Sequence, residues 1–223
     1  MGKYGIFRES NYFYLLIIVK TPLLLSSPNS LKKKIVIFAS GNGSNAENII
    51  RYFKGTGKAE VSAVFSNNRS AKVLRRAHDL DVKAIHFDRE ALYDTNEVLN
   101  LLKDMKPDLI VLAGFLWIFP DKILKRFPNK VINIHPALLP KYGGKGMYGM
   151  NVHKAVVEKK ELETGISIHF VNEKYDEGKL IFQETTPVLP KDSAEDIAEK
   201  IHELEQEHFP KVIEQLLFPS KDD

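Results

Sequence analysis

Cysteine is absent from this sequence of 223 residues. The chain therefore has no disulfide, no thiol nucleophile and no cysteine-ligated zinc site. The absence fits a cytoplasmic protein, and we expect that location. The histidines show no metal-ligand spacing, so we expect no metal site either.

A long uninterrupted apolar run is also missing. The most apolar segment, residues 13–25, is broken by Lys20 and Pro22, whereas a membrane-spanning helix needs about 20 apolar residues. It is a poor match to a signal peptide, because SSPNS at residues 26–30 is a weak cleavage site. We expect no membrane association, and we interpret residues 1–31 as an extension of unknown role; disorder and a misplaced gene start are both open interpretations.

The sequence has no large excess of one charge. It carries 32 basic and 29 acidic residues, for a net charge of +3. Nucleic-acid binding requires basic residues gathered on one face, and no such stripe is present. The one dense basic run, residues 32–34, is typical of a solvated entry to a strand. We therefore expect no nucleic-acid partner.

What the sequence does contain is a series of short apolar runs that alternate with helical patterns. Strands are predicted over residues 35–39, 61–65, 84–87, 109–113 and 131–134, and helices near 44–53, 71–78 and 96–105. This alternation predicts an α/β fold with a doubly wound, mostly parallel, Rossmann-like sheet.

The pattern changes after His135. A loop over residues 138–150 contains four glycines; a helix over 152–160, strands over 166–171 and 179–186, and a helix over 193–217 follow. Pro210 predicts a kink or a break in the last helix, near Phe209. We assign one domain to residues 32–218 and a tail to residues 219–223.

The first candidate site is the glycine-rich turn SGNGSN, residues 40–45, between a strand and a helix. Glycines let backbone amides approach an anion, and a helix N-terminus favours negative charge. The turn lacks the three-glycine spacing of dinucleotide sites and the lysine of a P-loop. A phosphate site and a tight structural turn are both open interpretations.

The second candidate site is Asn133-Ile134-His135 at the end of the fifth strand. Alternation along a strand places Asn133 and His135 on one face. An amide can donate to an oxyanion, and an imidazole can transfer protons near neutral pH. A strand cap and a structural histidine are the alternatives. Asp176, in a polar turn, either bonds its own backbone or folds back onto His135.

Several motifs together resemble the single-domain phosphoribosylglycinamide formyltransferases. They are SGNGSN (40–45), AVFSN (63–67), VLAGF (111–115) and NIHPALLPKY (133–142). The resemblance runs from about residue 34 to about residue 217. It implies a formyltransferase fold and transfer of the formyl group of 10-formyltetrahydrofolate to the amino group of glycinamide ribonucleotide in purine biosynthesis. It implies no metal, and we expect a monomer or a weak homodimer.

The resemblance also implies roles for individual residues. Asn133 would hold the formyl oxygen, His135 would act as general acid, and Asp176 would pair with His135 and raise its pKa. The phosphate would be bound by Gly43, Ser44 and Asn45, and the acceptor amine by Glu205. The folate would contact Arg89, Leu116, Trp117, Ile118, Phe119, Val131, Asn133 and Val171.

The sequence departs from the family pattern at two places. Trp117 stands where the best-known members have arginine, and GGKGMYGM at residues 143–150 replaces a shorter step. The loop borders the acceptor site in the family, so another small phosphorylated amine is an open alternative as acceptor.

Formyltetrahydrofolate hydrolase is a second alternative function, although that enzyme usually carries a regulatory domain that 31 residues cannot form. A methionyl-tRNA formyltransferase is longer, and a binding module without catalysis would not need Asn133, His135 and Asp176 together.

A shortened protein that begins at Lys32 is expected to keep its fold and activity, because residues 1–31 carry no motif. A loss of 1 kcal/mol lowers the melting temperature by about 2–4 °C in a protein of this size. The melting temperatures of the full-length and shortened proteins should therefore agree within about 2 °C. A larger drop would show that the extension packs on the domain.

Overall fold

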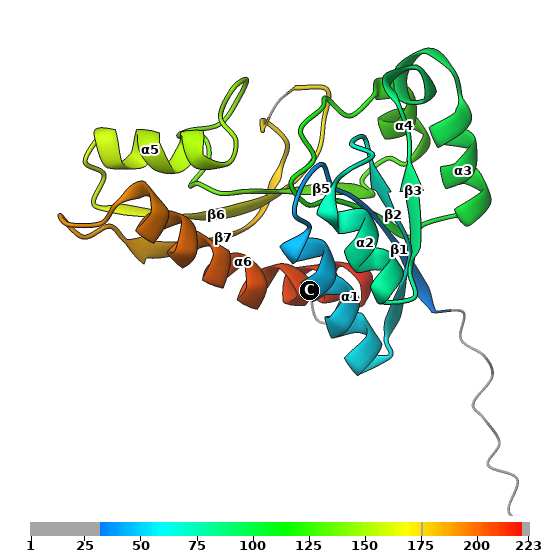
Figure 1. Ribbon diagram of the computed structural model, residues 1–223, viewed down its shortest axis with the longest axis horizontal. Coiled ribbons are helices and arrows are strands. Elements are labelled where there is room, and N and C mark those ends of the chain that lie inside the picture. Colours follow the sequence, from blue (N-terminus) through cyan, green and yellow to red (C-terminus); the bar gives the residue numbers. More distant parts are fainter. Residues whose placement is uncertain (1–31, 175, 220–223) are drawn as a thin grey trace, which may run out of the picture. The chain divides into compact units, whose positions relative to one another are not determined.

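The computed structural model describes residues 32–174 and 176–219. Within this part of the chain, seven strands form one sheet in the order β3-β2-β1-β4-β5-β6-β7 (Figure 1). The first five strands run parallel, whereas β6 is antiparallel to β5 and β7 is antiparallel to β6. The prediction of a doubly wound, mostly parallel α/β sheet is confirmed. The strands are β1 (Lys33–Phe38), β2 (Ala59–Ser66), β3 (Lys83–His86), β4 (Leu109–Leu112), β5 (Val131–His135), β6 (Glu163–Phe170) and β7 (Leu180–Pro187).

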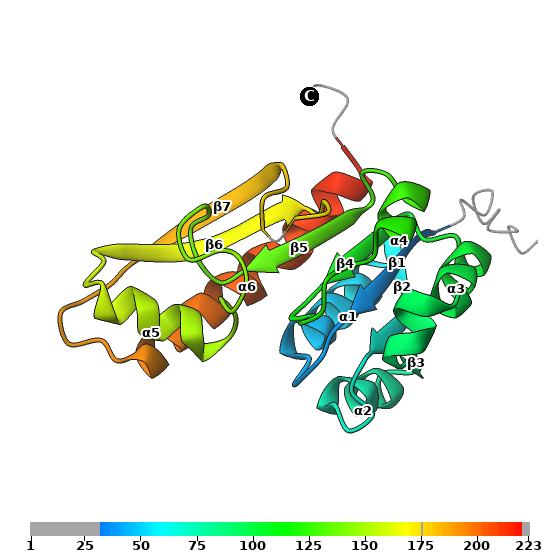
Figure 2. The ribbon, with the colours of Figure 1, turned by 90° about the horizontal axis from the view of Figure 1, so that it is seen from above.

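Helices cover both faces of the sheet, with α1 and α6 on one face and α3 and α4 on the other (Figure 2). The helices are α1 (Ser44–Thr56), α2 (Lys72–Asp79), η1 (Glu90–Asp94, a π-helix), α3 (Glu97–Met105), α4 (Asp121–Arg126), α5 (Met150–Glu158) and α6 (Ala194–Leu217). Alternate residues of β1 supply the two cores: Ile35 and Ile37 pack under α1, and Val36 and Phe38 pack under α3. The predicted extension, residues 1–31, lies outside the described residues.

The order of the strands creates a crevice above β1 and β4. From β1 the chain proceeds outward to β2 and β3, and from β4 it proceeds in the opposite direction to β5. The loops that leave the carboxyl ends of β1 and β4 therefore diverge. Open α/β sheets bind ligands at such a switch point. The turn at residues 40–45 and the end of β5 both lie at this edge of the sheet.

Two short helices were not predicted from the sequence. The π-helix η1 has five residues and α4 has six, which is too short for an amphipathic period to show. Ser193 is the N-cap of α6 and forms a capping box with Asp196. This confirms the predicted start of the last helix.

A kink or a break was predicted near Phe209, and the break does not occur, since α6 is a single element of 24 residues. A proline inside a helix leaves the carbonyl four residues earlier without its backbone donor. That carbonyl belongs to Gln206, and it accepts a hydrogen bond of 2.7 Å from Nδ2 of Asn48 on α1. The side chain of a neighbouring helix thus replaces the missing bond.

Asn48→Ala should lower the free energy of unfolding by about 1–3 kcal/mol, because it leaves the half-buried Gln206 carbonyl without a donor. Pro210→Ala restores the backbone N–H at that place. The double variant Asn48→Ala/Pro210→Ala should therefore lose less stability than the sum of the two single variants. Urea unfolding of all four proteins measures this coupling, and strictly additive losses would contradict it.

Candidate active site

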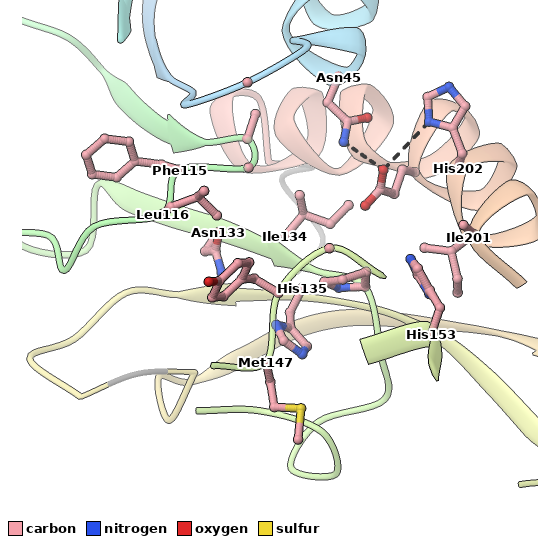
Figure 3. Close-up of a pocket in the computed structure, with 18 of the residues that line it drawn as sticks. Asn45, Phe115, Leu116, Asn133, Ile134, His135, Met147, His153, Ile201 and His202 are labelled. Carbon is pink, nitrogen blue, oxygen red and sulfur yellow. Dashed lines mark hydrogen bonds and ion pairs between the residues drawn. The ribbon is translucent and has the colours of Figure 1, made fainter. Parts of the chain in front are cut away.

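A cavity of about 460 Å³ lies at the carboxyl edge of the sheet (Figure 3). Its wall is formed by four segments: residues 41–45 after β1, 113–116 after β4, 133–136 at the end of β5, and 144–149 before α5. We call residues 143–149 the glycine loop. The rest of the wall is formed by His153 of α5, Asp176, and four residues of α6: Ala198, Ile201, His202 and Glu205. The cavity occupies the switch point that the strand order creates.

The β1–α1 turn ends at Gly43, the N-cap of α1, with φ 78°. A side chain at this position would collide with Val73, so glycine is required there. No side chain caps the helix, and the first amides of an uncapped helix are available to an anion. The predicted phosphate residues Gly43, Ser44 and Asn45 all line the cavity.

The side chain of Asn45 is already engaged by α6. Its Nδ2 donates to Glu205 at 2.8 Å, and its Oδ1 accepts from Gln206 at 2.9 Å. Glu205 also lies 3.8 Å from Nδ1 of His202. In this arrangement, Asn45 offers an anion its backbone amide rather than its side chain.

Asn133 and His135 lie on the same face of β5, as predicted from strand alternation. Asn133 is half-buried, and its Nδ2 donates to Nε2 of His169 at 3.2 Å. His135 is 3% exposed, and its Nε2–H donates to the carbonyl of Tyr142 at 2.7 Å. Both residues line the main cavity.

Asp176 folds back onto β5, which confirms the predicted approach. Its Oδ2 lies 3.6 Å from Nδ1 of His135 and accepts a bond of 2.9 Å from the amide of Gly144. Its Oδ1 lies 3.6 Å from Nε2 of His169 and accepts from Asn133 at 3.4 Å. The one carboxylate therefore contacts β5, β6 and the glycine loop.

The turn that carries Asp176 depends on Gly178. A side chain at residue 178 would collide with the carbonyl oxygen of Phe170. Asp176 itself has φ 54°, in the left-handed region that aspartate tolerates better than most residues. The spacing of aspartate and glycine in this turn thus has a steric cause.

A second, smaller cavity of about 80 Å³ adjoins the first. Phe115, Asn133 and Asp176 line both cavities. Of the predicted folate residues, Trp117, Ile118, Phe119 and Val171 line the second cavity, and Leu116 lines the main one. Val131 lines neither; it is 2% exposed and packs in the core beneath them.

Aromatic rings surround Trp117. Its ring lies 6.3 Å from that of Phe87 and 6.1 Å from that of Tyr93. The guanidinium of Arg89 lies 4.8 Å from the Tyr93 ring centre and 5.9 Å from that of Trp117, within the range of a cation–π contact. Arg89 therefore lies beside Trp117, although it lines neither cavity. We call Phe87, Tyr93 and Trp117 the aromatic rim of the second cavity.

The chain is similar in sequence to proteins of one known family. The Formyl transferase family model matches residues 33–213. The chain belongs to the formyl transferase family. A phosphoribosylglycinamide formyltransferase of Escherichia coli is 37% identical over 185 residues, which are 80% of this chain and 84% of that protein. A chloroplastic phosphoribosylglycinamide formyltransferase of Vigna unguiculata is 34% identical over 190 residues, 83% of this chain.

Solved structures agree with this assignment. The crystal structure of glycinamide ribonucleotide transformylase 1 from Symbiobacterium toebii is similar with a TM-score of 0.75 and 30% identity; the match covers 82% of this chain and 86% of that one. The chain spans 61% and 64% of the length of the two plant relatives. The resemblance inferred from the sequence motifs is confirmed at the level of the family and the fold.

Three histidines that line the two cavities were not predicted as site residues from the sequence. His169 pairs with Asn133 across β5 and β6, so only the strand register reveals it. His153 and His202 reach the cavity from α5 and α6, and their positions depend on how those helices pack.

Over residues 32–174 and 176–219, no group of three acidic, histidine or cysteine side chains could hold a metal ion. No described helix is long and apolar enough to cross a membrane.

The ionisation of His135 corrects one expectation. Burial lowers the pKa of His135 below its ordinary value and outweighs the opposite effect of the Asp176 charge. The carboxylate acts to raise the pKa, as predicted, but its effect is smaller than that of burial. Burial also acts to raise the pKa of Asp176, yet its contacts with His169, His135 and Gly144 hold that pKa below the usual range.

Asp176→Asn should lower the pKa of His135 further, because the variant removes the only negative charge in contact with its Nδ1 among the described residues. Titration of the imidazole by NMR measures the shift. Glu173→Gln, which alters an exposed carboxylate in the same segment, is the matched control and should leave the value unchanged. A His135 pKa that rises in Asp176→Asn would contradict the pairing.

Proposed function

We propose that this formyl transferase family member transfers the formyl group of 10-formyltetrahydrofolate to the amino group of glycinamide ribonucleotide, a step of purine biosynthesis. The observation that carries the proposal is the junction of the two cavities at Asn133 and Asp176. Two substrates that bind in adjoining cavities can react only where those cavities meet. The names of the relatives support the choice of acceptor.

The acceptor occupies the main cavity. Its phosphate lies at the uncapped N-terminus of α1, where backbone amides and the helix dipole favour an anion. Glu205, in the opposite wall, approaches the acceptor amine. The cavity thus offers a positive end for the phosphate and a carboxylate for the amine.

The folate occupies the second cavity and the aromatic rim beside it. Trp117 and Val171 supply apolar area there, and Arg89 stands next to Trp117. Trp117 contributes apolar contact area at the position where the best-known family members have an arginine, which would contribute a charge.

The reaction requires an oxyanion donor and a proton carrier near each other. When the amine attacks the formyl carbon, the formyl oxygen gains negative charge, and the Nδ2 of Asn133 donates to it. Negative charge beside His135 raises its pKa, so more of the imidazole is protonated and can deliver the proton that the departing folate nitrogen needs. Asp176 holds that imidazolium through Nδ1. No step needs a metal.

The substrates are the partners in this proposal. A cytoplasmic location and a monomeric or weakly dimeric state stay predictions from the sequence.

The direct test is an assay of donor consumption. Purified protein is mixed with 10-formyltetrahydrofolate, with and without glycinamide ribonucleotide. Loss of the donor only in the presence of the acceptor supports the proposal. Loss without the acceptor identifies a hydrolase, and loss only with a different phosphorylated amine reassigns the acceptor.

Gly41→Val should raise the KM for the acceptor about tenfold or more, equal to about 1.4 kcal/mol of binding. Gly41 lines the cavity, and a Cβ there meets no protein atom within 4 Å. The added side chain therefore obstructs the ligand without disturbing the fold, unlike a change at Gly43. Gly55→Val, on α1 with equally open surroundings, is the control. An unchanged KM for the acceptor would show that this turn does not bind the phosphate.

Asn133→Ala should lower kcat by about a hundredfold to a thousandfold, the usual effect of removing one oxyanion donor. Binding of both substrates should be largely retained, because other residues form most of each cavity wall. Asn100→Ala, an exposed asparagine on α3, should leave kcat unchanged. A rise in KM at constant kcat would reassign Asn133 to substrate binding.

A further inference from the structure

His153 is a buried polar side chain, and one of its ring nitrogens lacks a hydrogen-bond partner among the described residues. It lies on α5 between Val152 and Val156, both buried, and is itself only 6% exposed. Its Nδ1 is buried and has no hydrogen-bond partner among the described residues. A buried imidazole in this state destabilises the fold, so packing alone does not account for it.

The imidazole borders the main cavity. Figure 3 shows it extending from α5 toward Ile201 and His202 of α6, with His135 on the adjoining side. The other titratable or charged groups of the cavity wall are His135, Lys145, Tyr148, Asp176, His202 and Glu205. Of these, Glu205 acts to raise the pKa of His153 and His135 acts to lower it.

His135 and Glu205, the other basic and acidic groups that the proposed reaction uses beside His153, are already engaged. His135 bonds the Tyr142 carbonyl and contacts Asp176. Glu205 accepts from Asn45 and contacts His202. His153 is therefore the cavity histidine whose hydrogen-bonding capacity is unmet within the described part of the chain.

The proposed reaction needs such a group. An α-amino group has a pKa of about 7.7–8.0, so a large share of an acceptor amine is protonated at neutral pH. An ammonium has no lone pair and cannot attack the formyl carbon. A base beside Glu205, which would hold the ammonium, meets this need.

We propose that His153 is the base that deprotonates the acceptor's ammonium. The inference rests on the proposed function. One N–H bond of the ammonium breaks, and its electron pair stays on nitrogen as the lone pair that attacks. The proton bonds to the imidazole, which becomes an imidazolium opposite Glu205 and releases the proton to solvent after the products leave. Burial lowers the pKa of His153, the largest effect on it, so the free ring is neutral and able to accept a proton.

The test compares His153→Ala and His153→Gln with the unaltered protein between about pH 6 and pH 9. Loss of a general base costs about 10²–10⁴-fold, and this loss in kcat/KM for the acceptor is expected near pH 7. The deficit should shrink as pH rises through the pKa of the amine, because the free amine then forms without help. Added imidazole should restore part of the activity of His153→Ala. The KM for the folate should not change.

Two results would overturn the inference: undiminished activity of both variants, or a loss that is equal at every pH and insensitive to imidazole. Melting temperatures of both variants identify a folding defect, and His153→Gln keeps a polar side chain if the alanine variant unfolds. His78→Gln, an exposed histidine on α2, is the control. If the unaltered protein shows no acceptor-dependent transfer, the proposed function fails. If the unaltered protein transfers the formyl group and the His153 variants do so equally well, only the inference about His153 fails.

Discussion

The carboxylate of Asp176 is the interaction on which the site depends. It holds the glycine loop through the amide of Gly144, β5 through Asn133 and His135, and β6 through His169. The glycine loop and Asp176 lie 32 residues apart in sequence, and this carboxylate joins them to the ends of two paired strands. A carboxylate that is 13% exposed and charged is stable only when such partners surround it. Its presence therefore fixes the positions of the amide and the imidazole at the junction of the two cavities.

A second set of polar contacts joins the amino-terminal and carboxyl-terminal helices. Asn45 and Asn48 lie one turn apart on α1. Asn45 bonds the side chains of Glu205 and Gln206 on α6, and Asn48 donates to the Gln206 carbonyl. One of these bonds replaces the donor that Pro210 lacks. The same helix-to-helix contact positions Glu205 in the cavity wall. Packing of α1 on α6 and the placement of Glu205 in the cavity wall thus rest on a single group of contacts.

Much of this could be predicted from the sequence. Buried strands appear as apolar runs, because strands covered on both faces need them. The shared face of Asn133 and His135 follows from strand alternation, and the exposed start of α1 follows from the glycines before it. These features are local, and a short stretch of sequence contains their cause.

The remainder depends on contacts between distant segments. The bond from Asn48 to Gln206 spans 158 residues, and nothing near Pro210 indicates that the helix survives. Val131 lies in the core rather than at the cavity wall because the strand turns that side chain inward. The sign of the pKa shift of His135 depends on how burial compares with one charge, which no spacing reveals. His153 reaches the cavity only because α5 packs on α6.

A crystal structure with glycinamide ribonucleotide and an unreactive folate bound together would show whether the two substrates meet at Asn133. We expect the phosphate on the backbone amides of residues 41–45, the folate beside Trp117 and Val171, and the amine and the formyl position meeting at Asn133. A phosphate bound elsewhere, or a folate that leaves Asn133 and Asp176 uncontacted, would contradict this expectation.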